Sequence, residues 1–240
     1  MEDYERTGKT WFTILECRQM KIKVYNKKIP YMVIDDWYTD TELKAIWSEI
    51  DFYTNGRDLK DVLRADETIV ARDDDTNKSL AESYRWYPNQ YYNMNQGNLS
   101  PIFRFSSKLR CEELHNAFKD VYPWYNMFLS TNFSTPMVSY YEGGDYYKPH
   151  YDSFMYTQLI WLTKKPKLWT DGNLYVEPIE HKKEKILFKN NRSVIFPSMM
   201  RHSVDPIQWK EKPKESGYGR YTVTYFMYHE PTYQIPDDTK

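Results

Sequence analysis

The order of apolar and polar residues predicts two strands and then a helix near the start of the chain. The segment 20–25 alternates with period two, and the apolar run 31–37 is too short for a helix, so each predicts a strand. From Thr39 the period changes, because Glu42 follows three residues later in a capping-box pattern. An apolar stripe at helical spacing then occupies Leu43, Ile46, Trp47 and Ile50. We expect this helix to pack on the back of a sheet.

Residues 55–105 show no sustained period. Fifty such residues are unusual in a compact domain, so we expect short strands or helices and one functional loop there. The aromatic run 84–92 either packs in the core or offers rings to a substrate, and the acidic cluster 73–75 is typical of a solvated loop. A second helix is predicted where helical spacing returns and Pro123 marks its end, at Cys111, Leu114, Phe118 and Val121.

From Met137 onward the helical spacing disappears and short apolar runs alternate with turns. Strands are predicted at 137–141, 157–162, 173–176, 193–196 and 221–229. The charged segments 180–185 and 210–216 mix both signs, which is typical of solvated loops between strands. This half of the chain is therefore predicted to be all β.

Composition narrows the class of protein. The length of 240 residues without an evident linker favours one domain. The 33 basic and 34 acidic residues nearly cancel, which argues against a nucleic-acid or anionic-membrane partner. Aromatic residues make up 18% of the chain, and this abundance suits sheets that carry rings at a cleft.

The two cysteines and the N-terminus bear on location. Cys17 and Cys111 are too far apart in sequence for a disulfide framework or a zinc ribbon, which favours a reducing compartment. The N-terminal residues are charged where a signal peptide is apolar, and no run approaches the roughly 18 apolar residues of a membrane span. We predict a cytoplasmic protein.

The candidate chemistry lies in the all-β half. His150 and Asp152 are two positions apart, so on a strand both side chains project from one face and can hold one metal ion. Such a pair alone is more often a simple hydrogen bond, but His202 offers a third ligand. Two imidazoles and one carboxylate leave three positions open, as in non-haem Fe(II) oxygenases, although zinc hydrolases use similar ligands. Arg220 favours the oxygenase, because an arginine behind the site can grip a dicarboxylate in a bidentate pair.

These residues and their neighbours resemble the Fe(II)- and 2-oxoglutarate-dependent dioxygenases, and within them the prolyl-hydroxylase-like branch. The resemblance covers about residues 137–228 and rests on Tyr140, Gly144-Asp145-x-Tyr147, His150-x-Asp152, Asp171-Gly172-x-Leu174, Phe196, His202-Ser-Val-x-Pro206 and Gly219-Arg220-Tyr-Thr-Val-Thr224. The entry segment 30–50 is also similar to that branch. Two departures are the single glycine of Asp171-Gly172 and a long spacing from His202 to Arg220, which we attribute to a surface insertion at 210–217.

The resemblance implies a fold that is mainly β with supporting α. It is a double-stranded β-helix, a jelly-roll of the cupin-like kind, with N-terminal helices packed on one sheet. Residues 1–240 would then form a single dioxygenase domain. Within it, residues 1–136 supply N-terminal strands, helices and a substrate loop, and residues 137–230 form the jelly-roll catalytic core.

The resemblance also implies a role for each candidate residue. His150, Asp152 and His202 would ligate Fe(II), and Arg220 would pair with the far carboxylate of 2-oxoglutarate. Thr222 lies on the same strand face as Arg220 and could reach the same carboxylate. The family's cosubstrate-binding tyrosine stands ten residues before the first histidine, the position of Tyr140.

Three further residues are placed on the substrate side. Tyr147 precedes the first histidine by three residues and is expected to line the substrate mouth. Trp161 stands on the strand where relatives often place another cosubstrate-facing tyrosine. Arg201, next to His202, either contacts substrate or forms a surface salt bridge.

The implied cofactors are Fe(II), 2-oxoglutarate as cosubstrate and O2, with ascorbate as a candidate reductant. The substrate implied by the branch is a prolyl residue in a protein or peptide, and a small-molecule hydroxylase acting on an amino acid or sugar-like compound is the alternative. Nucleobase-demethylating relatives carry a second arginine six residues after the first, where this chain has Phe226. A non-catalytic jelly-roll binding module is a third hypothesis, but it has no need for four converging polar groups.

Overall fold

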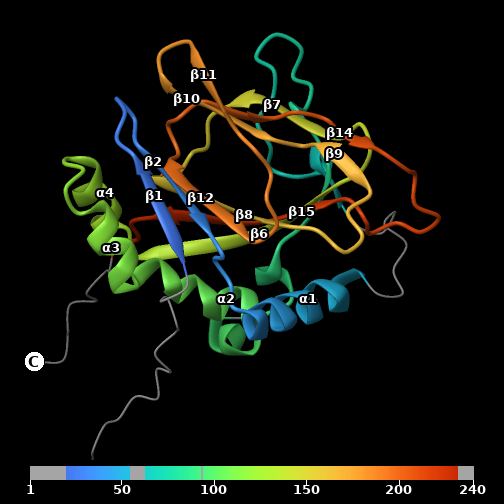
Figure 1. Cartoon of the computed structure of the whole chain (residues 1–240), viewed down its shortest axis with the longest axis horizontal. Coiled ribbons are helices and arrows are strands. Elements are labelled where there is room, and N and C mark those ends of the chain that lie inside the picture. The colour runs from blue at the N-terminus through green and yellow to red at the C-terminus, as the bar shows by residue number, and fades with distance from the viewer. Residues whose placement is uncertain (1–19, 55–62, 93, 232–240) are drawn as a thin grey trace, which may run out of the picture.

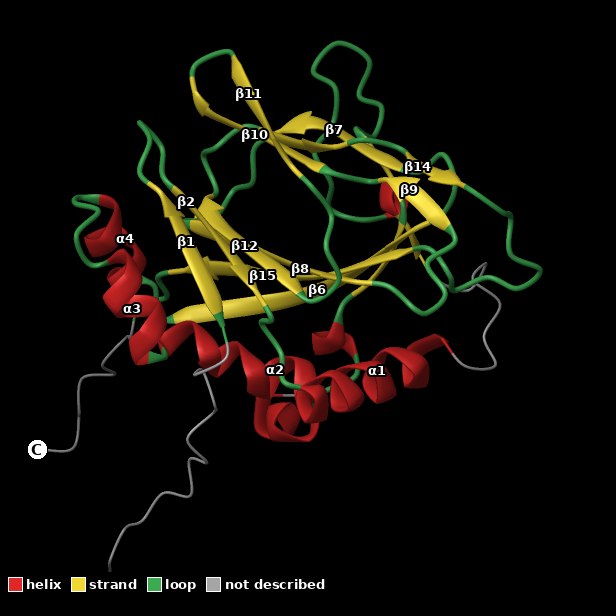
Figure 2. Ribbon diagram, viewed as in Figure 1, coloured by secondary structure: helices red, strands yellow, loops and turns green. Residues whose placement is uncertain are grey.

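Two antiparallel sheets stand face to face, as Figures 1 and 2 show for the computed structural model, which describes residues 20–54, 63–92 and 94–231. The larger sheet has eight strands in the order β1 (Lys21–Tyr25), β2 (Tyr31–Asp35), β12 (Arg192–Pro197), β8 (Tyr156–Leu162), β15 (Arg220–Tyr228), β6 (Phe133–Tyr141), β5 (Tyr84–Trp86) and β3 (Leu63–Arg64). The smaller sheet has five strands in the order β11 (Lys182–Ile186), β10 (Leu174–Ile179), β13 (His202–Val204), β7 (Tyr146–His150) and β4 (Ala81–Glu82). A separate pair joins β14 (Ile207–Trp209) to β9 (Trp169–Asp171). This is the predicted double-stranded β-helix.

Helices cover the outer face of the larger sheet (Figure 2). They are α1 (Asp40–Thr54), α2 (Pro101–Phe105), α3 (Glu112–Phe118) and α4 (Trp124–Ser130), with short 3-10 turns at η3 (Ala65–Glu67), η4 (Pro88–Gln90), η5 (Met94–Leu99) and η6 (Ser106–Arg110). Ile46 and Ile50 of α1 are fully buried in one cluster with Ile160 and Val223 of the sheet. Burying these apolar side chains holds the helical layer in place. Among the described residues, no helix has the length and apolar character needed to cross a membrane.

The predicted start of the first helix is confirmed. The backbone N–H of Thr39 donates to Glu42 Oε2 at 2.8 Å, and the N–H of Glu42 donates to Thr39 Oγ1 at 3.2 Å. This reciprocal capping box satisfies two backbone donors that a helix otherwise leaves unpaired.

The predicted end of the second helix is wrong. Helix α3 ends at Phe118, and Pro123 is the N-cap of the next helix, α4. A proline lacks an N–H and has a fixed φ, which suits the first turn of a helix as well as the region beyond its end. The sequence pattern does not distinguish these two positions.

The segment 63–105 contains the short strands and helices that its length predicted. The aromatic run 84–92 mainly serves packing, because Trp86 is buried and the ring of Tyr84 lies 6.1 Å from that of Tyr140. Asp73 accepts hydrogen bonds from the N–H and hydroxyl of Thr76 in an exposed turn, as expected for a solvated loop. Strand β5 pairs with β6 and so extends the larger sheet.

All described helices precede residue 133, which confirms the predicted all-β half. Between the two sheets, one end is filled by a second apolar cluster that includes Trp161, Leu174, Val176 and Phe196. The other end contains the polar residues described next.

Candidate metal centre and its pocket

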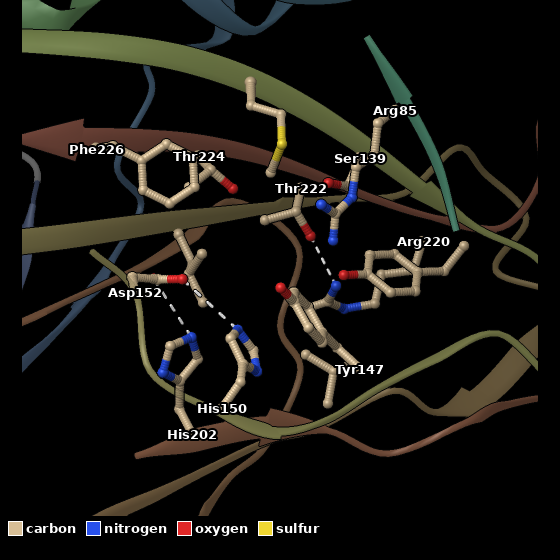
Figure 3. A pocket seen from close by; sticks show the side chains of 14 residues that line it. Arg85, Ser139, Tyr147, His150, Asp152, His202, Arg220, Thr222, Thr224 and Phe226 are labelled. Atoms are coloured by element: carbon tan, nitrogen blue, oxygen red, sulfur yellow. Dashed lines mark hydrogen bonds and ion pairs between the residues drawn. The ribbon is translucent and has the colours of Figure 1, made fainter. Parts of the chain in front are cut away.

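Two histidines and one carboxylate meet at the mouth between the sheets. His150 ends β7 and His202 begins β13, and these residues face each other in the β7–β13 pairing with ring centroids 4.2 Å apart. Asp152 completes the group, with Oδ1 3.6 Å from His150 Nε2 and Oδ2 3.5 Å from His202 Nε2 (Figure 3). One ligand atom from each residue lies within 4.8 Å of the others.

Neighbouring atoms orient the three side chains toward one point. Nδ1 of His150 donates to the Lys148 carbonyl at 2.8 Å, and Nδ1 of His202 donates to the Met200 carbonyl at 2.9 Å. Each Nε2 is thereby left as a lone-pair donor facing Asp152. Burial and the neighbouring His202 hold the pKa of His150 well below its usual value, so its imidazole is neutral, the form that binds a metal. The donor set fits a divalent ion.

The carboxylate has its own support. Thr157 Oγ1 donates to Asp152 Oδ2 at 2.6 Å and lies 2.8 Å from Ser198 Oγ. The backbone N–H of Asp152 donates to the Ser198 carbonyl at 3.1 Å. These bonds hold the carboxylate against β8. Neither Thr157 nor Ser198 was singled out from the sequence, because their role depends on the pairing of β8 with β12.

Arg220 forms the inner end of the pocket. Only 1% of this residue is exposed, and Nη1 donates to Thr222 Oγ1 at 2.7 Å. Nε and Nη2 are buried without a hydrogen-bond partner. Burial lowers the pKa of Arg220 to about 10, so the guanidinium stays charged at neutral pH. A buried charge with two unpaired nitrogens is costly unless an anion pairs with it, and the free edge matches a carboxylate.

One cavity connects the metal ligands with Arg220. Its walls include six residues singled out from the sequence, His150, Asp152, His202, Arg220, Thr222 and Tyr147. Further polar residues on the same walls are Arg85, Ser139, Tyr141 and Thr224. The structure thus brings together the predicted ligands and the predicted anion-binding arginine.

Tyr140 is not in this cavity, which corrects the prediction of a cosubstrate contact. Its side chain is buried on the opposite face of β6, in the cluster beneath the helices. Its hydroxyl accepts from the N–H groups of Gly217 at 2.7 Å and Gly219 at 3.2 Å. Tyr141 lines the cavity instead, because it pairs directly with Arg220 and side chains alternate along a strand.

The three residues predicted on the substrate side have different positions. The Tyr147 ring stacks on His150 with centroids 3.4 Å apart and lines the outer cleft. Arg201 donates to Glu177 at 3.1 Å on the surface, the salt bridge that was its alternative. Trp161 is 0% exposed, with the Arg220 guanidinium 5.4 Å from its ring, so it lies behind the pocket and away from the substrate mouth.

An outer cleft of about 500 Å³ adjoins the metal ligands. Tyr147 and Asp152 line this cleft as well as the inner cavity, so the cleft opens onto the metal centre. Most of its other walls are apolar or aromatic, including Ile69, Val70, Met137, Phe154 and Phe226. A substrate in the cleft has direct access to the three ligands.

Part of the chain matches a known family. Residues 136–228, which span β6 to β15, match the family model described as the 2OG-Fe(II) oxygenase superfamily. A comparison with curated proteins finds no significant match. The family match covers the strands that carry His150, His202 and Arg220, and together with the three converging ligands it supports a 2-oxoglutarate-dependent dioxygenase.

Solved structures refine this placement. A Pseudomonas putida prolyl-4-hydroxylase has a TM-score of 0.56 at 13% identity, covering 84% of this chain and 93% of that one. A Trichoplax adhaerens prolyl hydroxylase, in complex with a hypoxia inducible factor peptide fragment, has a TM-score of 0.53 at 18% identity, covering 82% and 83%. At these identities the likeness concerns the fold, and that fold is prolyl-4-hydroxylase-like. The family implies Fe(II), 2-oxoglutarate and O2 as the cofactors.

Proposed function

We propose that this protein hydroxylates a prolyl residue in a protein or peptide, with release of succinate and CO2. The observation that carries the proposal is the single cavity that joins His150, Asp152 and His202 to the buried guanidinium of Arg220. A metal centre and an anion site at the two ends of one cavity match a cosubstrate that has a chelating end and a distant carboxylate.

The protein's own residues would bind and orient the reactants. His150, Asp152 and His202 would hold Fe(II), and Arg220 would pair with the far carboxylate of 2-oxoglutarate, with Thr222 fixing the guanidinium. The bound metal would supply the oxidation, in which one oxygen atom of O2 enters succinate as 2-oxoglutarate loses CO2 and the other enters the substrate. The apolar cluster behind Arg220 keeps water out, which strengthens the pairing of charges in the pocket.

The prolyl substrate rests on two supports. The fold is prolyl-4-hydroxylase-like, and the outer cleft has a volume of about 500 Å³ and is lined by aromatic rings. Tyr147, at the border of cleft and cavity, would contact the ring that is oxidised. Ascorbate would act as the reductant that keeps the iron in the ferrous state.

The same cleft also suits a small-molecule substrate, so the substrate class needs a direct test. Peptide pools and a cell lysate are treated with the enzyme, Fe(II) and 2-oxoglutarate, and mass spectrometry locates any residue or metabolite that gains one oxygen atom. Oxygen on a proline supports the proposal. Oxygen found only on free metabolites supports the small-molecule alternative.

The dioxygenase chemistry is tested separately by spectroscopy. Anaerobic Fe(II) with 2-oxoglutarate should give a visible charge-transfer band, and His150→Ala should abolish it. The control is His229→Ala, because His229 is exposed at the far end of β15 and donates to the Ser130 carbonyl. Absence of the band in the wild type, together with no succinate in air, would favour the non-catalytic binding module.

A further inference from the structure

A second buried arginine faces the same cavity. Arg85 lies on β5, is 2% exposed and has Nε and Nη2 buried without a hydrogen-bond partner. Nη1 makes one long contact of 3.4 Å with the Ile69 carbonyl. Figure 3 shows the guanidinium pointing into the cavity beside Ser139. The mechanism proposed above uses Arg220 and leaves Arg85 without a role.

Arg85 stands where the inner cavity meets the outer cleft. It lines both spaces, as Tyr147 and Asp152 do. Its guanidinium carbon is 5.1 Å from the centre of the Tyr147 ring, and that ring stacks on His150. A group bound to Arg85 would therefore lie close to the metal centre and within reach of a molecule in the outer cleft.

The charge of Arg85 is not balanced by a protein carboxylate. Among the described residues, no aspartate or glutamate oxygen approaches its side chain within 4.0 Å, whereas Arg64, Arg192 and Arg201 all have acidic partners at shorter distances. The nearby Asp152 is engaged by Thr157 and faces the two histidines. A buried, unpaired cation is costly and is retained where a bound ligand supplies the opposite charge.

The free atoms indicate which anion fits. Nε and Nη2 form one edge of the guanidinium, and two parallel N–H groups on that edge match the two oxygens of a carboxylate. Arg220 has the same two atoms free at the inner end of the cavity. A neutral carbonyl would accept one hydrogen bond but would not balance the charge. The rest of the cleft wall is largely apolar, with Ile69 98% exposed at the mouth.

We propose that Arg85 binds a carboxylate of the substrate, so that the preferred substrate is an acid with an apolar skeleton near the oxidised carbon. This inference rests on the proposed function for the reaction, and it adds the charge of the substrate. The carboxylate could belong to a free acid or to an acidic side chain next to the hydroxylated residue of a peptide. Arg85 is then the residue that selects the substrate, while Arg220 serves the cosubstrate.

The test uses trifluoroacetate as the carboxylate probe and trifluoroacetamide as its neutral analogue. The full-length protein is loaded with paramagnetic Mn(II) and saturating 2-oxoglutarate, which occupies Arg220, and the 19F relaxation of each probe is titrated. We expect saturable enhancement for trifluoroacetate, at least tenfold weaker binding in Arg85→Gln, and partial retention in Arg85→Lys. Arg104→Gln, on the exposed surface of α2, is the matched control and should behave as the wild type.

Each contrary result has a defined meaning. Equal relaxation enhancement by trifluoroacetamide overturns the inference, because Arg85 would then bind a neutral carbonyl. Trifluoroacetate binding that survives in Arg85→Gln also overturns it, because the probe would then bind the metal alone. Displacement of trifluoroacetate at lower concentration by N-acetyl-L-proline assigns the carboxylate to a free acid. Displacement at lower concentration by acetyl-aspartyl-prolinamide assigns it to a peptide side chain.

The inference and the proposed function fail in different ways. The anaerobic charge-transfer band of Fe(II) with 2-oxoglutarate does not involve Arg85, so Arg85→Gln should keep it. A normal band without Arg85-dependent probe binding removes only the inference. Arg85-dependent binding in a protein that shows no band removes the proposed function and leaves an acid-binding site.

Discussion

Nη1 of Arg220 donates to Oγ1 of Thr222 at 2.7 Å, on one face of β15. The bond uses the only nitrogen of this guanidinium that has a partner and leaves Nε and Nη2 unpaired, in a residue that lines the cavity. The hydroxyl of Thr222 therefore sets the angle at which Arg220 can meet a carboxylate.

Thr222→Val should weaken 2-oxoglutarate binding while iron binding stays normal. Loss of one hydrogen bond to a charged group corresponds to about a tenfold rise in the KM for 2-oxoglutarate. The matched variant Thr224→Val removes a hydroxyl from the same face of β15 without removing the partner of Arg220, and should change the KM less. Steady-state succinate formation measures both, and an unchanged KM in Thr222→Val would contradict the positioning role.

Tyr140 and Tyr141 should respond in opposite ways to the same substitution. Tyr141→Phe alters a wall of the cavity and should raise the KM for 2-oxoglutarate. Tyr140→Phe removes the acceptor for two backbone N–H groups and should lower the free energy of unfolding by about 1–3 kcal/mol, with little change in that KM. Urea denaturation and kinetics on both variants provide the comparison. The reverse assignment would restore Tyr140 as the cosubstrate residue.

Thr157→Val should reduce Fe(II) affinity by about 10- to 100-fold, as loss of a hydrogen bond to a ligating carboxylate usually does. Thr157 Oγ1 is the donor that holds Asp152 Oδ2. Ser193→Ala is the control, since it deletes a buried hydroxyl bonded to Gln158 between the same strands, β8 and β12. Anaerobic iron titration should separate the two variants. Equal iron affinities would show that Asp152 needs no such support.

The metal-free protein should lose stability in mild acid. The pKa of His150 is lowered in the folded state, from a usual value of 6.5, by burial and by His202. Below that usual value the unfolded chain binds a proton that the folded chain does not, so the free energy of unfolding falls as the pH drops toward the folded pKa. His150→Gln should flatten this dependence in urea melts, whereas the exposed control His181→Gln should leave it unchanged. A wild-type stability that is constant from neutral pH to pH 5 would contradict the shift.

Two of the metal ligands could be predicted from the sequence because they are close together in it. His150 is the last residue of β7 and Asp152 follows two residues later, close enough in sequence for both to reach one point. The strands themselves follow from short apolar runs separated by turns, as at β6, β8 and β15. His202 and Arg220 were identified because their spacing from His150 and Asp152 along the chain resembles that in a known family.

The remaining parts of the site depend on register and on contacts between distant segments. Two consecutive tyrosines occupy opposite faces of β6, and only the pairing with Arg220 decides which one faces the cavity. Arg85 lies on a strand of three residues whose place is set by pairing with β6, more than fifty residues away in sequence. Local periodicity carries no signal for such a position.

The hydroxyl of Tyr140 also holds the backbone between the charged segment 210–216 and β15. Because it anchors the backbone at Gly217 and Gly219, Arg220 enters the sheet from a fixed point, whatever the conformation of the charged segment 210–216. We therefore expect residues 212–216 to tolerate an insertion, because doubling the length of a loop costs only about 0.6 kcal/mol in closure entropy. A fluorescent label or recognition tag could be inserted there without changing the position of Arg220 in the cosubstrate pocket.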